Sequence, residues 1–540
     1  MFTINIASFV GFTALVAVIS WLMTRHDKMT DSTAYFLAGR SLTAWFIAGS
    51  LMLTNLSTEH LIGLNGDAFN HTIAVTAWET TAALAMVLTA LYFLPRYLKS
   101  GFTTIPQYLS QRYDGKTQVI ATILFLISYV LAILPVVLLL GATGIESLFD
   151  ISKTFGITYK QSIWLIVWLV GILGSIYVVF GGLKAVAISD TINGVGFLIA
   201  GLMIPLLALR YVGDGSMFAG LKEVYVEEHA KFDITGNEPG SFLPMGVLFT
   251  GMVVNQIFFW CTNQVIVQRT LGAKSLAEGQ KGVLIAAFFK LLGPFIIVLP
   301  GVIAFHMFKD KLSSEEYLMA YPMLVKAVLP PVFVGFFAAV MVGAVLTTFD
   351  SVLNSSATLF SEGIHRTLKP SASGRSIVLS GRVCSIILAI SAMTMAPLLN
   401  TSGSLYNYLQ KINATFFGPM LAVVLLGFFT RRVSALAAKV GLIAGPLLFY
   451  LLVFVFGDTV QVWLKSTFHL VDDVHFLHFL ASVFVLTVIL MLVISIFKPA
   501  KRIYEQEYTH DVDITPWKHA KLAGLVVSVA AILFYILLAQ

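Results

Sequence analysis

Charged residues are scarce in this chain of 540 residues. Aspartate, glutamate, lysine and arginine together make up 11%, whereas a soluble domain carries about 25%. Hydrophobic residues make up 58%, and the mean hydropathy is +0.87. This composition excludes a soluble enzyme and a disordered scaffold. The net charge of +6 does not indicate a nucleic-acid-binding protein, because basic residues in a membrane protein set its orientation.

Cysteine is almost absent. Cys261 and Cys384 both lie within apolar runs, so they cannot form a disulfide framework, and we interpret them as packing residues. The sequence has no HExxH motif and no run of cysteine or histidine at metal-ligand spacing. DGKT at 114–117 is only a weak match to a phosphate loop, because Ser110 stands where the first glycine belongs. A membrane-embedded enzyme and an ATP-driven pump therefore have no support.

Long apolar runs, by contrast, fill the chain. A transmembrane helix requires about 20 predominantly apolar residues. Fourteen runs are candidates, at about 5–24, 44–66, 72–96, 117–148, 161–180, 185–209, 243–268, 279–307, 329–362, 376–398, 402–428, 433–456, 472–497 and 519–539. No basic stretch precedes the first run, which is also too long for a signal peptide, so we expect it to be retained.

The basic residues predict the orientation. If the amino terminus is outside, the inner connections hold 23 of the 34 basic residues and the outer connections hold nine. Cytoplasmic loops carry an excess of lysine and arginine, so we expect both termini outside a cell membrane. The lack of long loops favours a bacterial inner membrane. The acidic stretch 211–241 then lies outside and is expected to include a short amphipathic helix.

Polar clusters interrupt two of the apolar runs. TNLSTEH occupies 54–60, while Asn255-Gln256 and then 260–264 interrupt the run at 243–268. Broken helices at membrane depth survive only where they line a cavity. Breaks at matching positions of two halves indicate an inverted-repeat secondary transporter with a site at the midplane. The alternative is that these polar side chains only join helix to helix.

The breaks lie five spans apart and define the predicted organisation. It consists of an additional N-terminal helix and cytoplasmic loop (1–43), a first five-helix repeat (44–210), an external loop (211–242), a second repeat (243–428) and three C-terminal helices (429–540).

Four charged residues lie deep in predicted spans: Glu79, Asp190, Lys290 and Asp350. Each costs at least about 2.5 kcal/mol at the bilayer centre, so each is a functional candidate. Glu79 and Lys290 either only neutralise each other or share hydrogen bonds with a polyhydroxyl solute. For Asp190, the alternative is an ion pair with Lys184 at a helix end.

Adjacent hydroxyls make 347–351 the best cation candidate. Thr347 and Thr348, with Asp350 nearby, offer the oxygen ligands that hard cations such as sodium prefer. Carbonyls of the broken helix near Leu53 and Leu56 could complete the shell. The alternative is that the hydroxyls bond to backbone carbonyls of their own helix.

Six sequence motifs stand out: YFLAGRSL (35–42), TNLSTEHLIG (54–63), WE (78–79), NQVIVQRTLGAKSLAEGQKG (263–282), FFKLLGPFIIVLPG (288–301) and TTFDSVLNSSAT (347–358). They resemble motifs of the sodium/solute symporter family, and most of all those of its bacterial sodium/galactose and sodium/glucose-type cotransporters. The likeness covers about 1–498. It implies an all-α polytopic membrane protein with a leucine-transporter-like five-plus-five inverted repeat inside about fourteen helices. It also implies a symporter of Na⁺ and a small polar solute, and not an enzyme.

The resemblance also implies site residues. The solute contacts would come from Asn55, His60, Trp78, Glu79, Gln256, Lys290 and Gln410, with Phe259 and Trp260 at the inner gate and Tyr406 on the outer side. Sodium ligands would be the carbonyls of Leu53, Leu56 and Ala344 with the hydroxyls of Thr347 and Thr348. A second sodium would use Asp190, Thr347, Asp350 and Ser351.

Four departures leave the solute open. Sodium/galactose transporters have glutamine, serine, asparagine and tyrosine where this chain has His60, Ala82, Gln256 and Phe259. Each change alters which donor or acceptor meets the solute. A sugar such as galactose or glucose is favoured, with sialic acid or another organic solute as the alternative. A non-transporting sensor or a channel of the same fold is a further alternative.

Overall fold

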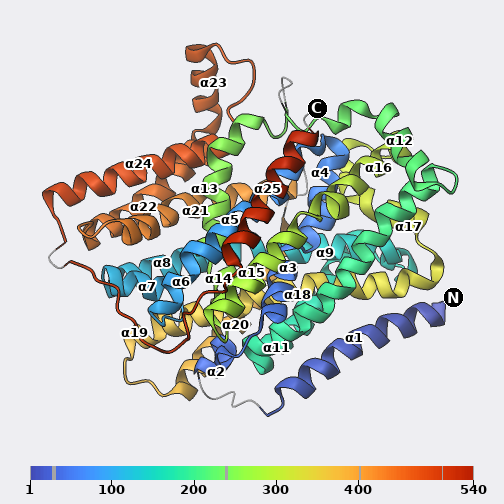
Figure 1. Cartoon of the computed structure of the whole chain (residues 1–540). Helices are drawn as coiled ribbons and strands as arrows, with labels where there is room; N and C mark the ends of the chain where they lie inside the picture. Colours follow the sequence, from blue (N-terminus) through green and yellow to red (C-terminus); the bar gives the residue numbers. More distant parts are fainter. Residues whose placement is uncertain (1, 27–31, 237–240, 400–402, 501–502, 539–540) are drawn as a thin grey trace.

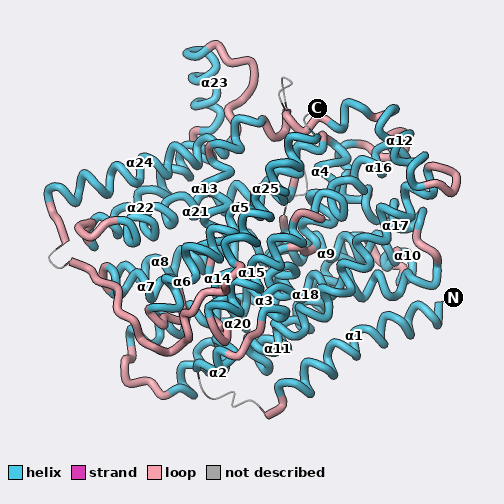
Figure 2. The backbone as a smooth tube through the Cα atoms, viewed as in Figure 1, coloured by secondary structure: helices cyan, strands magenta, loops and turns pink. Residues whose placement is uncertain are grey.

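The computed structural model describes residues 2–26, 32–236, 241–399, 403–500 and 503–538. The terminal residues whose side of the membrane the charges predict, 1 and 539–540, lie outside the described residues, as do parts of the predicted segments 1–43, 211–242, 243–428 and 429–540. The described chain is almost entirely helical (Figures 1 and 2). Its only β pairing consists of two isolated bridges, Leu42 with Ala273 and Ser275 with Asp513.

Twelve helical segments of the described chain are long and apolar enough to cross a membrane. Their helices are α1 (Phe2–Thr24), α5 (Ala77–Leu88), α8 (Gly115–Ser128), α9 (Leu134–Phe149), α11 (Tyr159–Val212), α15 (Leu276–Lys290), α16 (Leu299–Phe308), α18 (Val334–Phe360), α20 (Gly374–Met395), α21 (Leu405–Phe429), α22 (Ala435–Tyr450), α24 (Phe476–Phe497) and α25 (Ala520–Leu538). Each segment matches a predicted span.

The other two predicted spans are interrupted helices. The first is α3 (Ala44–Asn55), the π-helical turn η2 (Glu59–Leu64) and α4 (Asn65–Asn70). The second is η7 (Met245–Phe249), α13 (Gly251–Ile257), the π-helical turn η8 (Phe258–Thr262) and α14 (Gln264–Leu271). With them, the described chain accounts for all fourteen predicted spans.

The long helix α11 contains two spans separated by a kink at Gly182. This glycine has φ +59° and ψ −170°, a conformation that residues with a side chain rarely adopt. A Cβ atom there would lie 2.8 Å from the carbonyl oxygen of Tyr35. Close approach of α2 (Ser32–Leu37) therefore requires glycine at the kink.

The interrupted helices lie in the interior of the bundle. Helix α3 packs against α11, α15 and α18, and α13 packs against α5, α21 and α24. Helix α1 lies on one flank, against α11 and α18, while α22 and α24 form the opposite flank (Figure 1). Because other helices surround both interruptions, their free backbone groups and polar side chains are kept away from lipid.

Short helices end or connect the spans. They are α6 (Leu94–Lys99), α7 (Ile105–Arg112), α10 (Ile151–Phe155), α12 (Met217–Glu227), α17 (Ala320–Val328), α19 (Arg366–Leu368) and α23 (Gly457–Phe468). Helix α12 is the short helix that was predicted within 211–241. An extended segment before α25 crosses the end of the bundle that we expect to be cytoplasmic. There Thr509 N–H donates to Lys99 O at 3.1 Å, and Leu276 N–H donates to Asp513 O at 2.8 Å.

Candidate functional site

The first break occurs where α3 ends. Leu56 leaves the helix with φ −77° and ψ 90°, and its N–H donates to Met52 O at 2.6 Å. The next residues enter the wide turn η2, in which Glu59 and His60 are both buried. The predicted interruption at 54–60 is therefore confirmed.

The second break occurs where α13 passes into η8. Asn263 is extended, with φ −69° and ψ 127°, and its side-chain oxygen accepts from Val265 N–H at 3.1 Å. The same oxygen accepts from Tyr129 OH at 2.6 Å. Asn263 thus caps the N-terminus of α14, and the break agrees with the one predicted at 255–264.

A cavity of about 50 Å³ lies between the two breaks. It is lined by Thr54, Asn55, Glu59, His60, Trp78, Glu79, Ile133, Asn255, Gln256, Phe259, Trp260, Val265, Thr348, Val352, Tyr406, Leu409, Gln410 and Asn413. The lining includes every predicted solute-contacting residue except Lys290. These residues come from both predicted repeats, so folding assembles one site from distant parts of the chain.

Lys290 lies behind this lining and holds two of its members. Its Nζ donates to Glu79 Oε2 at 2.6 Å and also to Asn55 Oδ1. His60 extends the network, because its Nε2 lies 3.3 Å from Glu79 Oε1. The Lys290 and Glu79 side chains are only 3% and 1% exposed. The network joins α15, α5 and the end of α3 at the cavity wall.

Two aromatic groups border the cavity. The ring of Tyr406, on α21, meets those of Trp78 and His60 edge to face, with centroids 5.7 and 5.4 Å away. In η8, the rings of Phe259 and Trp260 lie 5.4 Å apart at 77°. The predicted gate residues therefore belong to two separate groups, one centred on α21 and one on the second break.

Several polar atoms around the cavity have no hydrogen-bond partner in the protein. They are Glu59 Oε2, His60 Nδ1, Asn255 Oδ1 and Gln410 Oε1. Buried polar groups are nearly always hydrogen-bonded to protein or water. Four free acceptors and donors around one small cavity therefore fit a polar ligand or ordered water.

Thr54, Glu59, Asn255 and Asn413 also line the cavity, although sequence reasoning did not choose them. The first three lie within the polar interruptions, so the composition of the breaks already pointed to them. Asn413 lies three residues after Gln410 on α21, and helix periodicity places such residues on one face. Its side-chain oxygen accepts from Ser128 Oγ at 3.2 Å.

The hydroxyls of α18 meet the carbonyl end of α3. Thr347 Oγ1 lies 3.3 Å from Leu53 O and 3.1 Å from Ala344 O. Thr348 Oγ1 lies 3.2 Å from both Leu53 O and Thr54 O. Thr347 therefore makes one hydrogen bond within its own helix, as the alternative interpretation expects. The hydroxyl of Thr348 bonds instead to carbonyls of the broken helix α3.

The structure brings together four of the five groups predicted for the first cation and adds the carbonyl of Thr54. Leu56, the fifth, is fully buried at the break, where it packs in the hydrophobic core and its N–H donates to Met52 O. Oxygens of α3 and α18 therefore form a compact hard-ligand set.

The residues predicted for a second cation face different neighbours. Ser351 Oγ lies 3.0 Å from Thr54 Oγ1. Asp350 turns toward α11, where its Oδ1 has no partner and, with Thr347, it lines a cavity of about 20 Å³. Asp190 Oδ2 accepts from Ser50 Oγ at 2.5 Å. Thr347 and Asp350 thus share a small cavity that neither Asp190 nor Ser351 lines.

Comparison with known proteins agrees with this geometry. A family model described as the sodium:solute symporter family matches residues 35–445. The chain is 43% identical over 542 residues to the "Uncharacterized symporter YidK" of Escherichia coli, covering 100% of this chain and 92% of that protein. It is 30% identical over 464 residues to the sodium/glucose cotransporter of Vibrio parahaemolyticus, covering 82% and 83%. It is 32% identical over 481 residues to the human sodium/myo-inositol cotransporter 2, covering 82% and 69%.

Solved structures establish the fold. The chain superposes on a Na⁺-coupled sialic acid symporter in a substrate-bound, outward-open state with a TM-score of 0.76. The match has 19% sequence identity and covers 93% of this chain and 99% of that one. The predicted leucine-transporter-like fold is therefore confirmed.

Family membership confirms that the chain is a transporter and not an enzyme. Its many apolar helices make it a multi-pass membrane protein, as predicted. Because the family match spans most of the chain and includes both breaks, we conclude that this chain belongs to the sodium:solute symporter family.

Proposed function

We propose that the protein is a sodium-coupled symporter that imports a small, neutral polyhydroxyl solute, such as galactose or glucose, by alternating access. The observation that carries this proposal is the polar cavity between the two helix breaks. Glu59, His60, Asn255 and Gln410 each carry a polar atom without a hydrogen-bond partner in the protein. A solute with several hydroxyl groups can both donate hydrogen bonds to such atoms and accept them.

The charge of the cavity wall favours a neutral solute. Lys290 is paired with Glu79 and also holds Asn55, so its charge is not free for an anionic guest. A solute carboxylate would have to displace Glu79, leaving a buried carboxylate without compensation, which costs several kcal/mol. Sialic acid is therefore the less favoured solute, although a structural relative transports it.

Sodium is proposed to bind where α3 ends against α18. The carbonyls of Leu53, Leu56 and Ala344 and the hydroxyls of Thr347 and Thr348 are the proposed ligands. Thr348 also lines the solute cavity, so ion and solute would bind as neighbours.

Transport requires the cavity to open. A volume of about 50 Å³ accommodates only a few water molecules, so a hexose enters only when one aromatic group moves aside. We propose that the group around Tyr406 opens outward and that Phe259 and Trp260 open inward. Rocking of repeat 44–210 against repeat 243–428 would alternate the two openings.

The sodium gradient is sufficient to drive accumulation. One sodium ion entering down about 100 mV releases roughly 2.3 kcal/mol, and a tenfold concentration ratio adds about 1.4 kcal/mol. The total supports a solute ratio of roughly several hundred. A second ion near Asp350 would square that ratio. The charge distribution supports a cell-membrane location with both termini outside, and a bacterial inner membrane is our proposed setting.

Uptake by reconstituted protein tests the proposal. Proteoliposomes would be given labelled galactose or glucose under an inward sodium gradient, an inward proton gradient or neither. Uptake that rises with external sodium is the expected result. Uptake that follows pH and ignores sodium would show proton coupling, and sugar-triggered current without uptake would show a sensor. A thermal-shift screen of sugars, sialic acid and other organic solutes, with and without sodium, would identify the solute.

A further inference from the structure

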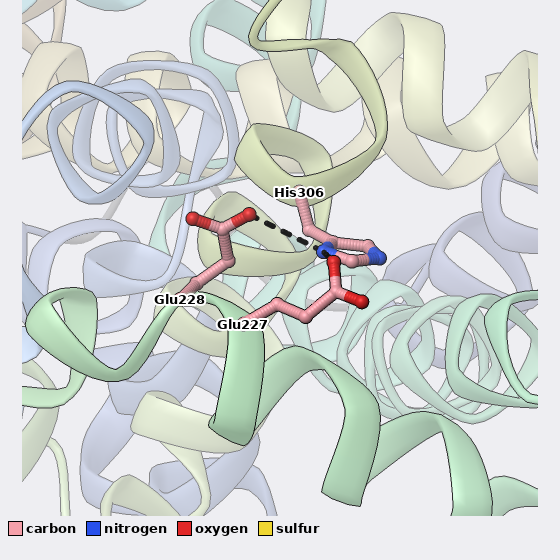
Figure 3. Close-up of side chains that lie close together, drawn as sticks. All are labelled: Glu227, Glu228 and His306. Atoms are coloured by element: carbon pink, nitrogen blue, oxygen red, sulfur yellow. Dashed lines mark hydrogen bonds and ion pairs between the residues drawn. The ribbon is translucent and has the colours of Figure 1, made fainter.

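A second polar cluster lies far from the solute cavity, where the loop after α11 meets the outer end of α16. His306 of α16 lies among carboxylates carried by α12 and its end. Its Nδ1 is 3.3 Å from Glu228 Oε1 and 3.7 Å from Glu227 Oε2 (Figure 3). Its Nε2 is 3.7 Å from Glu223 Oε1. The cluster therefore joins two segments that are about 80 residues apart in the chain.

The arrangement has the chemistry of a transition-metal site. One ligand atom each from Glu227, Glu228 and His306 lies within 4.8 Å of the others. Zinc binds imidazole nitrogen and carboxylate oxygen and commonly keeps a fourth position for water. The imidazole distinguishes the cluster from an all-oxygen site, which would suit calcium or magnesium.

The surroundings supply two further features of such a site. Glu223 faces the other ring nitrogen of His306, the position from which a carboxylate commonly fixes the orientation of a metal-bound histidine. The Glu228 side chain is only 8% exposed, whereas the Glu227 side chain is 56% exposed. One edge of the cluster is thus held in place while the other is open to ion entry.

Lys309 is the natural competitor for a metal. Its Nζ lies 2.5 Å from Glu228 Oε1, three residues after His306 in the chain. The lysine side chain is 39% exposed, so it can move into solvent when a divalent cation replaces its charge. Competition of this kind predicts that metal affinity rises when Lys309 loses its charge.

We propose that Glu227, Glu228 and His306 bind a divalent transition-metal ion of the zinc class, with Glu223 positioning the histidine and Lys309 competing for Glu228. The bound ion would fasten α12 to α16 on the face that we expect to be external. This inference depends neither on the transported solute nor on sodium coupling.

Calorimetric titration of the purified full-length protein with ZnCl₂, without an affinity tag, tests the site. We expect one zinc ion per chain. His306→Ala and Glu227→Gln should each weaken binding at least about tenfold, and Glu223→Gln should weaken it about 10- to 100-fold. His229→Ala, which removes a histidine of the same loop outside the cluster, should leave the affinity unchanged.

Lys309→Met is the sharpest variant, because the proposal requires a gain of function. It should tighten zinc binding several-fold, while Lys311→Met, a matched change two residues away, should not. Cobalt should give the visible absorption of a low-coordinate site, and this absorption should be lost in His306→Ala. The proposal is overturned if zinc does not bind, if His306→Ala binds as the parent does, or if Lys309→Met binds no more tightly.

Discussion

The proposed solute cavity and the proposed cation position share Thr348, yet they are built differently. The cavity is lined by side chains from both breaks and from α5 and α21, and several of its polar atoms have no partner. The proposed cation position consists mainly of backbone carbonyls at the end of α3 and two hydroxyls of α18, which contact one another directly. A single side-chain substitution can therefore change which solute the cavity binds. The cation position depends instead on the path of the backbone.

This difference explains why the cation position is easier to predict from the sequence than the solute is. Backbone carbonyls are available for any sequence once the helix breaks, so the cation position needs only a break and adjacent hydroxyls. Solute recognition depends on each donor and acceptor. His60 and Phe259, two positions at which this chain differs from sodium/galactose transporters, lie in the cavity lining. They alter the hydrogen bonds offered to a solute.

The largest effect is expected for Lys290→Gln, which removes the cation from the Asn55 and Glu79 network. An unpaired buried carboxylate costs about 3–5 kcal/mol, so we expect lower thermal stability as well as loss of solute uptake. Lys281→Gln, at a more exposed position of the same helix, is the control and should retain uptake.

The double variant Glu79→Gln with Lys290→Gln decides what the pair does. It removes both charges, so most of the stability should return. Uptake should stay low if the pair also contacts the solute. Recovery of uptake together with stability would show that the two residues only neutralise each other.

At the cation position, Thr348→Ala should raise the sodium concentration for half-maximal uptake at least about tenfold, because a hydroxyl ligand is removed from a small oxygen shell. Thr348→Ser keeps the oxygen and should remain close to the parent. Ser356→Ala removes a hydroxyl that donates to Val352 O of the same helix at 2.7 Å, and it controls for effects on the helix. Equal sodium dependence in all three variants would exclude Thr348 as a ligand.

In the cavity, His60→Gln should change selectivity rather than coupling. One hydrogen bond contributes about 0.5–1.5 kcal/mol, so the uptake ratio between sugars that differ at one hydroxyl should shift up to about tenfold. The sodium dependence should not move. Competition between epimeric sugars in the same proteoliposomes measures the ratio, and an unchanged ratio would remove His60 from the recognition site.

The smallest effect on uptake is expected for Asp350→Ala. Its carboxylate faces α11 and not the solute cavity, so solute should still be transported. If a second sodium binds there, the Hill coefficient for sodium should fall from near two to near one. An unchanged coefficient would leave one sodium ion per cycle.

Much of the fold follows from the sequence, because hydrocarbon requires long apolar helices and tolerates irregular backbone only in protected places. The fourteen spans and both breaks could be located from apolar runs and from the polar clusters at 54–60 and 255–264. Nine of the ten residues expected around the solute line one cavity, and the tenth, Lys290, bonds to two members of its lining.

Side-chain direction was the part that could not be predicted. Asp350 and Ser351 are adjacent in the sequence, but helix geometry turns them toward α11 and α3 respectively. Asn413 could have been chosen only by following the face of α21 that carries Gln410. The Glu227, Glu228 and His306 cluster forms because α12 packs against α16. His306 lies too far from the two glutamates in the sequence to form a recognisable motif with them.

The most direct test of the account is the binding of sugar measured by calorimetry at low and at saturating sodium. Adjacent sites that stabilise one another must do so reciprocally. We expect sodium to lower the Kd of the sugar and the sugar to lower the Kd of sodium by the same factor, and in Thr348→Ala the effect on the sugar should require at least about tenfold more sodium. A sugar Kd that does not change with sodium would contradict the central claim that the two breaks hold ion and solute together.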